Sequence, residues 1–528
     1  MIKRIIFKNR FQIFLLIIIV IGLWLRFYNL PNQVWSQAGY DEARDMLVAE
    51  HIYKYKETVN RGPLAAGGLN YLMNSPVYYY LVTFLWMITQ NPTSMMYLWA
   101  SLLTTQIPLA YLVGKQLGDK TTGIIAAIVF ALHNQLIFQS REVWQPNLLP
   151  IFSLLFLWVL LKNQKKKSLA LLLLMIFLLL FPLHLHYGVF LILPVGVFWV
   201  SYFWSQILEN NLSLKNIFLP VATTVGLIFS WLITTYKVKI FDQIFFLLII
   251  LKGSDTSFFN KSHELISKLK HMLWADTPSY LAVLITFILI TFSFFCKKER
   301  SRSKKTNWII ISLAFSALIG GLFPKEILTS YFFSTLPFFL ILFSLGIRQL
   351  ISINNYLGLV VVSVILFLIY LPTQNLIFFQ TPSESFLEQN YKVAEVIFSD
   401  QKNMNHEGKY SINFGIVALS TTVFQHFDGW GTSGVWFYLE ELFDKPLVKL
   451  TNYGVSHYPI TTDINYLYFV CDHRTLPELI NESCLNRFVE DRNYLSDYPD
   501  KIYQSQNYTV WKAAVDSKKH QGSYYHVH

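Results

Sequence analysis

The chain has 528 residues, of which 53% are hydrophobic and 17% aromatic, and its mean hydropathy is +0.39. So much apolar sequence excludes an ordinary soluble domain and predicts a polytopic membrane protein. The formal charge of +11 is unevenly divided, with 31 basic and 14 acidic residues before position 375 and 12 against 18 from there on. Basic residues beside apolar spans set topology and attract anionic lipid, and no basic stripe with interleaved aromatics predicts nucleic-acid binding.

Apolar runs long enough to cross a bilayer recur as far as residue 372. A hydrocarbon core of roughly 30 Å requires about 20 apolar residues of helix. Eleven segments fit, at 11–28, 94–113, 121–138, 148–161, 168–183, 189–204, 217–235, 280–295, 308–323, 331–347 and 356–371. A further apolar segment, 76–89, is short, opens with proline and follows a Gly- and Pro-rich stretch. We predict a juxtamembrane or re-entrant helix there, because such helices are tolerated where protein covers them.

Three clusters of basic residues set the predicted orientation. They lie at residues 3–10, 162–167 and 297–305, and they share one side only if segment 76–89 does not span. The positive-inside rule makes that side cytoplasmic, together with the N-terminus. We therefore expect a multi-pass protein of the cell membrane, with a first outer loop over residues 30–93 and an outer C-terminal segment. Six lysines between residues 237 and 270 then lie outside, which the rule tolerates in long loops.

The tail, 375–528, has a different texture from the predicted transmembrane domain, 1–374. Alternating apolar segments at 410–419 and 466–470 indicate strands, and residues 386–398 and 435–443 indicate helices. We predict an extracytoplasmic α/β or α+β domain of about 150 residues. Cys471 and Cys484 lie 13 positions apart in this domain. They form a disulfide if the domain is exported, or they remain free thiols, and the sequence does not decide between the two.

An acidic cluster, Gly39-Tyr40-Asp41-Glu42-Ala43-Arg44-Asp45, follows the first span. Apolar residues recur at helical spacing from Ala43 to Ile52, which predicts an amphipathic helix at the membrane interface. Asp41 and Glu42 then serve only as a helix cap and a first-turn acid, or they carry chemistry. A carboxylate at the lipid boundary is placed to deprotonate an acceptor hydroxyl, with its neighbour orienting it or holding a divalent cation.

Cations are the second requirement of such chemistry, because a lipid-phosphate leaving group develops negative charge. Arginines fall near the predicted outer boundary at positions 26, 44, 61 and 141. Their planar fork suits phosphate oxygens. For Arg26 alone, snorkelling at a helix end is the preferred reading.

The remaining candidates lie in two outer turns. Arg141 and Glu142 form an ion pair in one turn or an ordinary helix end. His184 and His186 bracket a leucine in the other, where histidines either pack by hydrogen bonds or act on an acceptor. The sequence has no Gly-rich phosphate loop, Cys/His zinc pattern or nucleophile elbow, so nucleotide-dependent chemistry is not predicted.

These motifs in this order resemble the GT-C glycosyltransferases. The resemblance rests on Tyr40-Asp41-Glu42-Ala43, Ser75-Pro76-Val77-Tyr78-Tyr79-Tyr80-Leu81 and Ser140-Arg141-Glu142, and it covers roughly residues 11–204. Within that superfamily it is similar to the branch of protein O-mannosyltransferases and bacterial aminoarabinose lipid A transferases. The resemblance implies a polyprenyl-phosphate-linked sugar as donor, transfer with inversion, and Asp41 as the base beside Glu42.

The resemblance also implies phosphate-binding roles, with departures. Arg141 is implied near the lipid phosphate, and Tyr331 with Pro337 is similar to a late Arg-Tyr…Pro segment. Thr329-Ser330 stand where an arginine is common, and Asn74-Ser75-Pro76 replaces a frequent His/Lys-Pro-Pro. Arg61 or Lys252 is expected to supply the missing cation, and Arg44 is also expected to bind the donor phosphate. Members of this branch commonly need no metal, so a divalent cation stays open and no other cofactor is expected.

The sequence therefore predicts an enzyme with a GT-C fold and about 11 transmembrane helices. We expect it to move a sugar from a polyprenyl-phosphate carrier to an extracytoplasmic glycan, lipid or protein, with membrane lipid around it. A lipid or glycan transporter or flippase is the first alternative. It is disfavoured because ionisable residues gather at one face, whereas transporters bury them at mid-membrane. An envelope-polysaccharide polymerase or ligase is the second, and its polar loop is expected late in the chain.

Overall fold

The computed structural model describes residues 2–33, 35, 39–63, 74–235, 267–268, 304–320, 329–353, 356, 358–360, 363, 385–404, 414–419, 433–447, 450–451, 454–455, 465–472, 495–505 and 508–515. The chain forms two compact units. The first comprises residues 1–30, 60–78 and 96–380, and the second comprises 31–59, 79–95 and 381–528. Two pieces of the predicted first outer loop therefore belong to the same unit as the tail.

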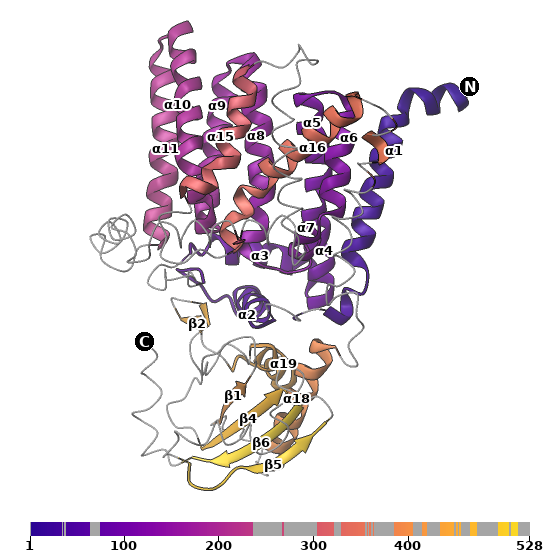
Figure 1. The fold of residues 1–528 in the computed structure, drawn as a ribbon. Helices are drawn as coiled ribbons and strands as arrows, with labels where there is room; N and C mark the ends of the chain where they lie inside the picture. The colour runs from indigo at the N-terminus through magenta and orange to yellow at the C-terminus, as the bar shows by residue number, and fades with distance from the viewer. Residues whose placement is uncertain are drawn as a thin grey trace. The chain divides into compact units, whose positions relative to one another are not determined.

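The first unit is a helical bundle (Figure 1). Helix α8 packs against α5 on one side and α9 on the other; α1, α6 and α16 adjoin α5, α10 and α11 adjoin α9, and α15 contacts α10 and α16. Its helices in chain order are α1 (Ile2–Phe27), α5 (Gln106–Leu117), α6 (Lys120–Leu132), α7 (Asn134–Gln139), α8 (Leu149–Lys166), α9 (Leu169–Leu180), α10 (Leu193–Asn210), α11 (Leu214–Thr235), α15 (Lys304–Gly320) and α16 (Leu336–Ile353).

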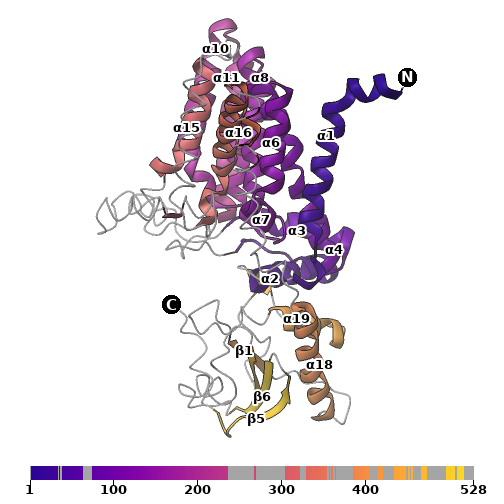
Figure 2. The same cartoon turned by 45° about the vertical axis from the view of Figure 1, so that its right-hand side comes forward.

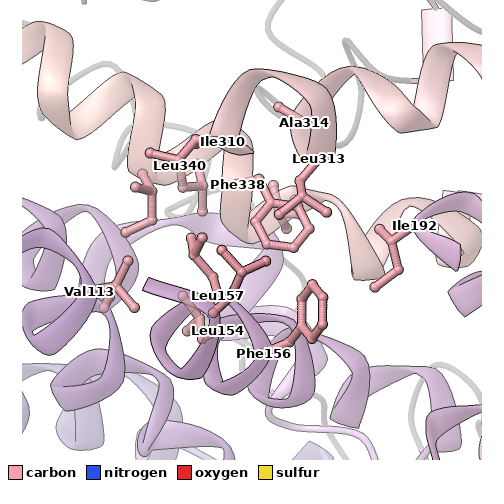
Figure 3. Packing of buried hydrophobic residues seen from close by; sticks show 14 of the residues in the cluster. Val113, Leu154, Phe156, Leu157, Ile192, Ile310, Leu313, Ala314, Phe338 and Leu340 are labelled. Atoms are coloured by element: carbon pink, nitrogen blue, oxygen red, sulfur yellow. The ribbon is translucent and has the colours of Figure 1, made fainter. Parts of the chain in front are cut away.

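Apolar side chains fill the middle of the bundle (Figure 3). Leu154 and Leu157 of α8 lie among Leu313 of α15 and Phe338 of α16, and all four are buried. Helices α5 and α6 approach closely at Gly123, where an added Cβ would come within 2.7 Å of the Tyr111 carbonyl oxygen. Small residues at such crossings drive helix association in membranes, where no hydrophobic force pulls helices together.

Two predicted spans are broken in the structure. Residues 94–113 divide into α4 (Pro92–Thr104) and α5, where Pro108 removes a backbone donor from the first turn of α5. Residues 121–138 divide into α6 and α7 at His133, whose backbone is extended. Of the described helices, four are long and apolar enough to cross a membrane, at Pro92–Leu117, Gln145–Lys166, Leu214–Thr234 and Leu336–Ile353. The predicted span 280–295 and most of 356–371 lie outside the described residues.

Short helices at the ends of the bundle carry His184 and Tyr331, and His186 directly precedes one of them. These are the 3₁₀ helices η3 (Gln145–Leu148), η4 (Phe181–His184), η5 (Tyr187–Leu191) and η6 (Thr329–Ser334). η6 packs against η3, η5 and α8. The hydroxyl of Ser334 donates to the Gly188 carbonyl at 2.7 Å, and that of Ser153 donates to the Ser334 carbonyl at 2.6 Å.

The second unit combines part of the first loop with the tail. From the loop come η1 (Pro31–Gln33), α2 (Gly39–Glu50), the π-helix η2 (His51–Tyr55) and most of α3 (Val77–Thr89). The predicted helix at 41–55 is present as α2 and η2, but α2 buries its charged residues as well as its apolar ones from Glu42 to Ala49, so it has no exposed polar face over these residues. The segment 76–89 forms the predicted helix, α3.

The tail contains a small mixed sheet (Figure 2). Its strands are β1 (Phe414–Leu419), β4 (Tyr466–Asp472), β5 (Asp500–Gln504) and β6 (Tyr508–Ala514), in the order β1-β4-β6-β5, and only β1 and β4 are parallel. Strands β2 (Leu450–Thr451) and β3 (Gly454–Val455) form a separate pair. Helices α18 (Phe386–Met404) and α19 (Ser433–Phe443) pack together. The predicted helices and strands of the tail are thus present.

Side-chain contacts connect the layers of this unit. The Tyr468 hydroxyl of β4 donates to Asp400 of α18 at 2.5 Å, and Lys512 of β6 lies 2.8 Å from the same carboxylate. Phe398 of α18 packs on Phe443 of α19. Cys471 of β4 is disulfide-bonded, as in proteins of oxidising compartments, and the other two cysteines lie outside the described residues.

Candidate functional site

The first turns of α2 hold a compact ionic cluster. Asp41 and Glu42 both lie in the first turn, and because α2 begins at Gly39, Asp41 is its third residue rather than the predicted helix cap. The guanidinium of Arg44 lies 2.5 Å from Asp41 Oδ1 and donates two hydrogen bonds to Asp45 Oδ1, at 2.9 and 2.7 Å. Tyr79 of α3 lies close enough to interact with all three charges. Two carboxylates therefore hold one arginine.

Burial decides which carboxylate can act on a substrate. The Asp41 side chain keeps 17% of its surface exposed, whereas that of Asp45 is fully buried. Burial by itself lowers the pKa of Arg44, but Asp41 and Asp45 outweigh it and raise that pKa well above its usual value. Arg44 thus stays cationic, with its charge more than balanced by its neighbours.

Sequence reasoning missed Asp45. Its position four residues after Asp41 places both on one helix face, and that spacing was the available signal. Glu42, 1% exposed, lies in the same turn. Among the described residues, no group of three or more His, Cys, Asp or Glu side chains is arranged to hold a metal ion. In this cluster Arg44 supplies the positive charge between the carboxylates.

In the first unit, the loop residues around Arg61 are tied to the bundle. The Gly62 amide donates to the Asn74 carbonyl and the Asn74 amide to the Pro63 carbonyl, and Arg61 is buried beside them. An added Cβ at Gly62 would lie 2.4 Å from the Ser75 carbonyl oxygen, so this close approach requires glycine. Ser75 Oγ lies 3.1 Å from His184 Nδ1, which brings two of the predicted motifs together.

The hydrogen bonds of His184 favour a packing role. Its Nε2 lies 3.2 Å from the hydroxyl of Ser230, which itself donates to the Leu227 carbonyl. A hydroxyl has one proton to donate, so Nε2–H donates to Ser230 and Nδ1 accepts from Ser75. Both ring nitrogens are thereby used within the bundle.

His186 and Tyr331, two separate candidates in the sequence, lie together. Their rings are 5.4 Å apart, and His186 Nδ1 accepts the Gly188 amide at 3.0 Å. An added Cβ at Gly188 would lie 3.0 Å from the Tyr331 backbone. Burial lowers the pKa of His186 to about 3, so its ring is neutral and carries its proton on Nε2.

Arg141 caps a helix in addition to any other role. Its Nη1 donates to the carbonyls of Arg26 and Tyr28 at 3.0 and 2.8 Å, which are oxygens that the last turn of α1 leaves without helical partners. Burial lowers the pKa of Arg141 to about 9, so the side chain is still charged at neutral pH. Glu142 is also buried, and its carbonyl accepts from Asn147.

Arg26 does not snorkel. It is fully buried in α1 and donates to the carbonyls of Gly22, Phe130 and Ala131. The preferred reading of a solvent-seeking helix end is therefore wrong, because the guanidinium satisfies the carbonyls at the end of α6. Lys252 lies outside the described residues.

Comparison of the whole fold with solved structures gives a match over nearly the full chain. ArnT from Cupriavidus metallidurans, bound to undecaprenyl phosphate, aligns with a TM-score of 0.58 and 11% identity, covering 96% of this chain and 98% of ArnT. ArnT in the apo state aligns with a TM-score of 0.57 over the same shares. The chain has the GT-C fold.

The GT-C fold is a membrane-protein fold, and its likeness here agrees with the long apolar helices. The chain is a multi-pass membrane protein. No protein-family model matches the sequence, and no curated protein matches it. At 11% identity the likeness establishes the fold alone.

Removing Arg44 tests the ionic cluster. Arg44→Met leaves two carboxylates facing each other in a buried site, and breaking such a pair costs about 3–5 kcal/mol of stability. We expect a large drop in the thermal midpoint in detergent. The double variant Arg44→Met/Asp45→Asn removes the repulsion and is expected to recover part of the lost thermal midpoint. A double variant no more stable than Arg44→Met contradicts the pairing of Arg44 with the two carboxylates.

The neutrality of His186 predicts an acid-dependent loss of stability. The pKa of His186 in the folded protein lies below its unfolded value of 6.5. The contribution of the neutral ring to the free energy of unfolding is therefore complete above pH 6.5 and is lost as the pH falls toward 3. By pH 5 the loss is about 2 kcal/mol. His186→Asn keeps an oxygen that accepts the Gly188 amide and does not titrate. Melting at pH 7.5 and 5.0 is expected to show a smaller acid shift in this variant than in the wild type.

Proposed function

We propose that the chain is a membrane glycosyltransferase that moves a sugar from a polyprenyl-phosphate carrier to an acceptor hydroxyl or amine. The observation that carries the proposal is the partly exposed Asp41 carboxylate beside Arg44 on the first-loop helix of a GT-C fold. The lipid in the ArnT complex, undecaprenyl phosphate, supports a carrier of this chemical class. The fold by itself does not fix an activity, so the proposal depends on the site.

Asp41 is the proposed general base. As the acceptor oxygen attacks the anomeric carbon, Asp41 takes the acceptor proton, the bond from that carbon to the phosphate oxygen breaks, and polyprenyl phosphate leaves with the electron pair. A single displacement of this kind inverts the anomeric configuration. Asp41 Oδ1 pairs with Arg44, and the partial exposure of the Asp41 side chain gives an acceptor a route to the carboxylate. Glu42 and Asp45 are proposed to set the electrostatic potential at the Asp41 carboxylate.

The leaving phosphate requires groups that balance its developing negative charge. Arg44 is a poor candidate, because two carboxylates hold it. Arg61 and Arg141 are buried cations in the first unit, and Lys252 is the third candidate. Because Nη1 of Arg141 donates to a carbonyl of α1, we propose that Arg141 mainly positions the phosphate site and contributes less to direct binding of the phosphate. The hydroxyl of Tyr331 is proposed to donate a hydrogen bond to a phosphate oxygen.

Acceptor-side roles are assigned to buried groups of the bundle turns. Glu142 and His186 are proposed to orient the acceptor, His186 as a neutral hydrogen-bonding group because burial suppresses its charge. His184 holds Ser75 and thereby supports the loop that carries Arg61. The C-terminal segment is proposed to lie on the extracytoplasmic side, where Cys471 keeps its disulfide.

The direct test uses purified full-length protein in lipid nanodiscs with radiolabelled undecaprenyl-phosphate monosaccharides and a panel of glycan, lipid and peptide acceptors. Transfer of label, or its slow release to water, is expected from the wild type. Asp41→Asn is expected to lose at least about 100-fold in kcat, because that is the smallest usual contribution of a positioned base. A fully active Asp41→Asn variant removes the base assignment.

Asp119→Asn is the matched control. Asp119 caps α6 through the Thr122 amide at 2.7 Å, and asparagine keeps that capping oxygen. Its transfer rate is expected to stay within about twofold of the wild type. Movement of the labelled lipid between leaflets without any chemistry favours a flippase and overturns the proposal. Activity only with diphosphate-linked oligosaccharides favours a polymerase or ligase instead.

A further inference from the structure

A buried ion pair joins the first loop to the C-terminal helix within the second unit. His51 Nε2, at the start of η2, lies 2.7 Å from Glu440 Oε2 of α19, although the two residues are 389 positions apart. Both side chains are at most 1% exposed. The other carboxylate oxygen, Glu440 Oε1, accepts the Leu447 amide at 2.8 Å, which fixes the carboxylate in one orientation.

Packing around this pair is extensive and aromatic. Helices α2 and α19 lie side by side in both views (Figure 1, Figure 2). Phe437 of α19 contacts Trp35 before α2 and Trp86 of α3, with ring centroids 5.7 and 5.8 Å apart. α19 thus sits against three segments of the loop, and the ion pair is the polar contact at the end of α2.

His51 lies where α2 changes into another helix type. It is the first residue of the π-helix η2, which is followed by Lys56 in a left-handed conformation with φ 58°. The backbone carbonyl of His51 accepts the Lys56 amide, so the chain reverses next to the ion pair. A buried ion pair is costly to break, since removing one partner leaves the other charge without compensation. The position of α2 is therefore tied to α19.

We propose that His51 and Glu440 are positioning residues, whose ion pair fixes α2 on the C-terminal helix α19 and holds the Asp41 carboxylate in place for proton abstraction. The inference rests on the proposed function, because α2 matters to catalysis only if Asp41 does. The C-terminal segment is then part of the catalytic unit. Neither residue touches a substrate, and both act through α2.

The charges around the pair give it a defined pH dependence. The other charged or titratable groups in the described surroundings are Glu50 on α2, Lys54 and Tyr55 on η2, Glu57 after it, Glu441 on α19 and Asp444, which pairs with Lys54. Burial opposes the charge of His51, but Glu440 and Glu57 outweigh it and raise the His51 pKa. Its stabilisation is fully present below pH 6.5 and is lost as the pH rises through the folded pKa.

Glu50 works in the same direction. Burial raises its pKa to about 7, with Glu440 and Glu441 adding to the effect against Lys54 and His51. The folded state therefore keeps a proton that the unfolded state has lost above pH 4.5, and stability falls as the pH rises toward 7. Both groups make the junction of α2 and α19 strongest in acid.

Hydrogen exchange of the full-length protein in nanodiscs, read by mass spectrometry on peptides covering residues 39–55, tests the junction without any substrate. After correction for intrinsic rates, His51→Gln and Glu440→Gln are each expected to raise exchange of these amides at least tenfold at pH 6. Glu441→Gln changes the exposed neighbour on the same helix and is expected to leave exchange unchanged. Glu50→Gln separates the titration of Glu50 from that of His51.

The same variants then enter the transfer assay with undecaprenyl-phosphate monosaccharides. For His51→Gln and Glu440→Gln we expect kcat to fall at least tenfold while KM stays within twofold of the wild type. The pH profile of transfer is expected to differ from that of the wild type only in these two variants. Unchanged α2 exchange in both variants, or equal effects from Glu441→Gln, overturns the inference. Full activity of Asp41→Asn with faster exchange in His51→Gln instead removes the catalytic role and leaves the junction standing.

Discussion

Helix α2 has to bury charge, and the surrounding structure is organised by the need to balance it. Arg44, Asp45 and His51 are almost completely buried on or just after this helix. A buried charge is tolerated only when it is paired and hydrogen-bonded. Arg44 finds two carboxylates one turn apart, and His51 finds Glu440 on a helix from the far end of the chain. Residues 31–59 and 79–95 of the loop lie in the same compact unit as the tail.

The bundle meets the opposite requirement. Its helices bury apolar side chains against each other, and its polar groups gather in short turns at helix ends, where 3₁₀ helices η3, η5 and η6 meet. There, serine hydroxyls and histidine nitrogens satisfy backbone groups that the helix ends leave open. Burial lowers the pKa of both His186 and Arg141, but only His186 becomes neutral at pH 7, because the ordinary pKa of arginine is much higher than that of histidine.

Sequence patterns predicted much of the fold because the signals are local. Apolar runs located most described helices, and period-two alternation located strands β1 and β4. The breaks at Thr105 and His133 were missed, although Pro108 and the polar pair His133-Asn134 interrupt these apolar runs. The GT-C fold was predicted from ordered motifs around Asp41 and Arg141, and the solved structures bear it out.

Pairings across the chain were beyond the sequence. Nothing near His51 indicates Glu440, and Asp45 was overlooked although its spacing from Asp41 places it on the same face. The clustering of His186 with Tyr331 likewise depends on how η5 packs on η6. Single-residue chemistry can be proposed from residue type, whereas the partner that sets charge and orientation comes only with tertiary structure.

In the proposed reaction, Asp41 activates an acceptor for a single displacement on a polyprenyl-phosphate-linked sugar. The most direct measurement is the anomeric configuration of the first product, read by proton NMR during transfer from an undecaprenyl-phosphate sugar of defined configuration. Complete inversion at the anomeric carbon is expected. A product that retains the donor configuration requires a covalent glycosyl intermediate and rules out a single displacement.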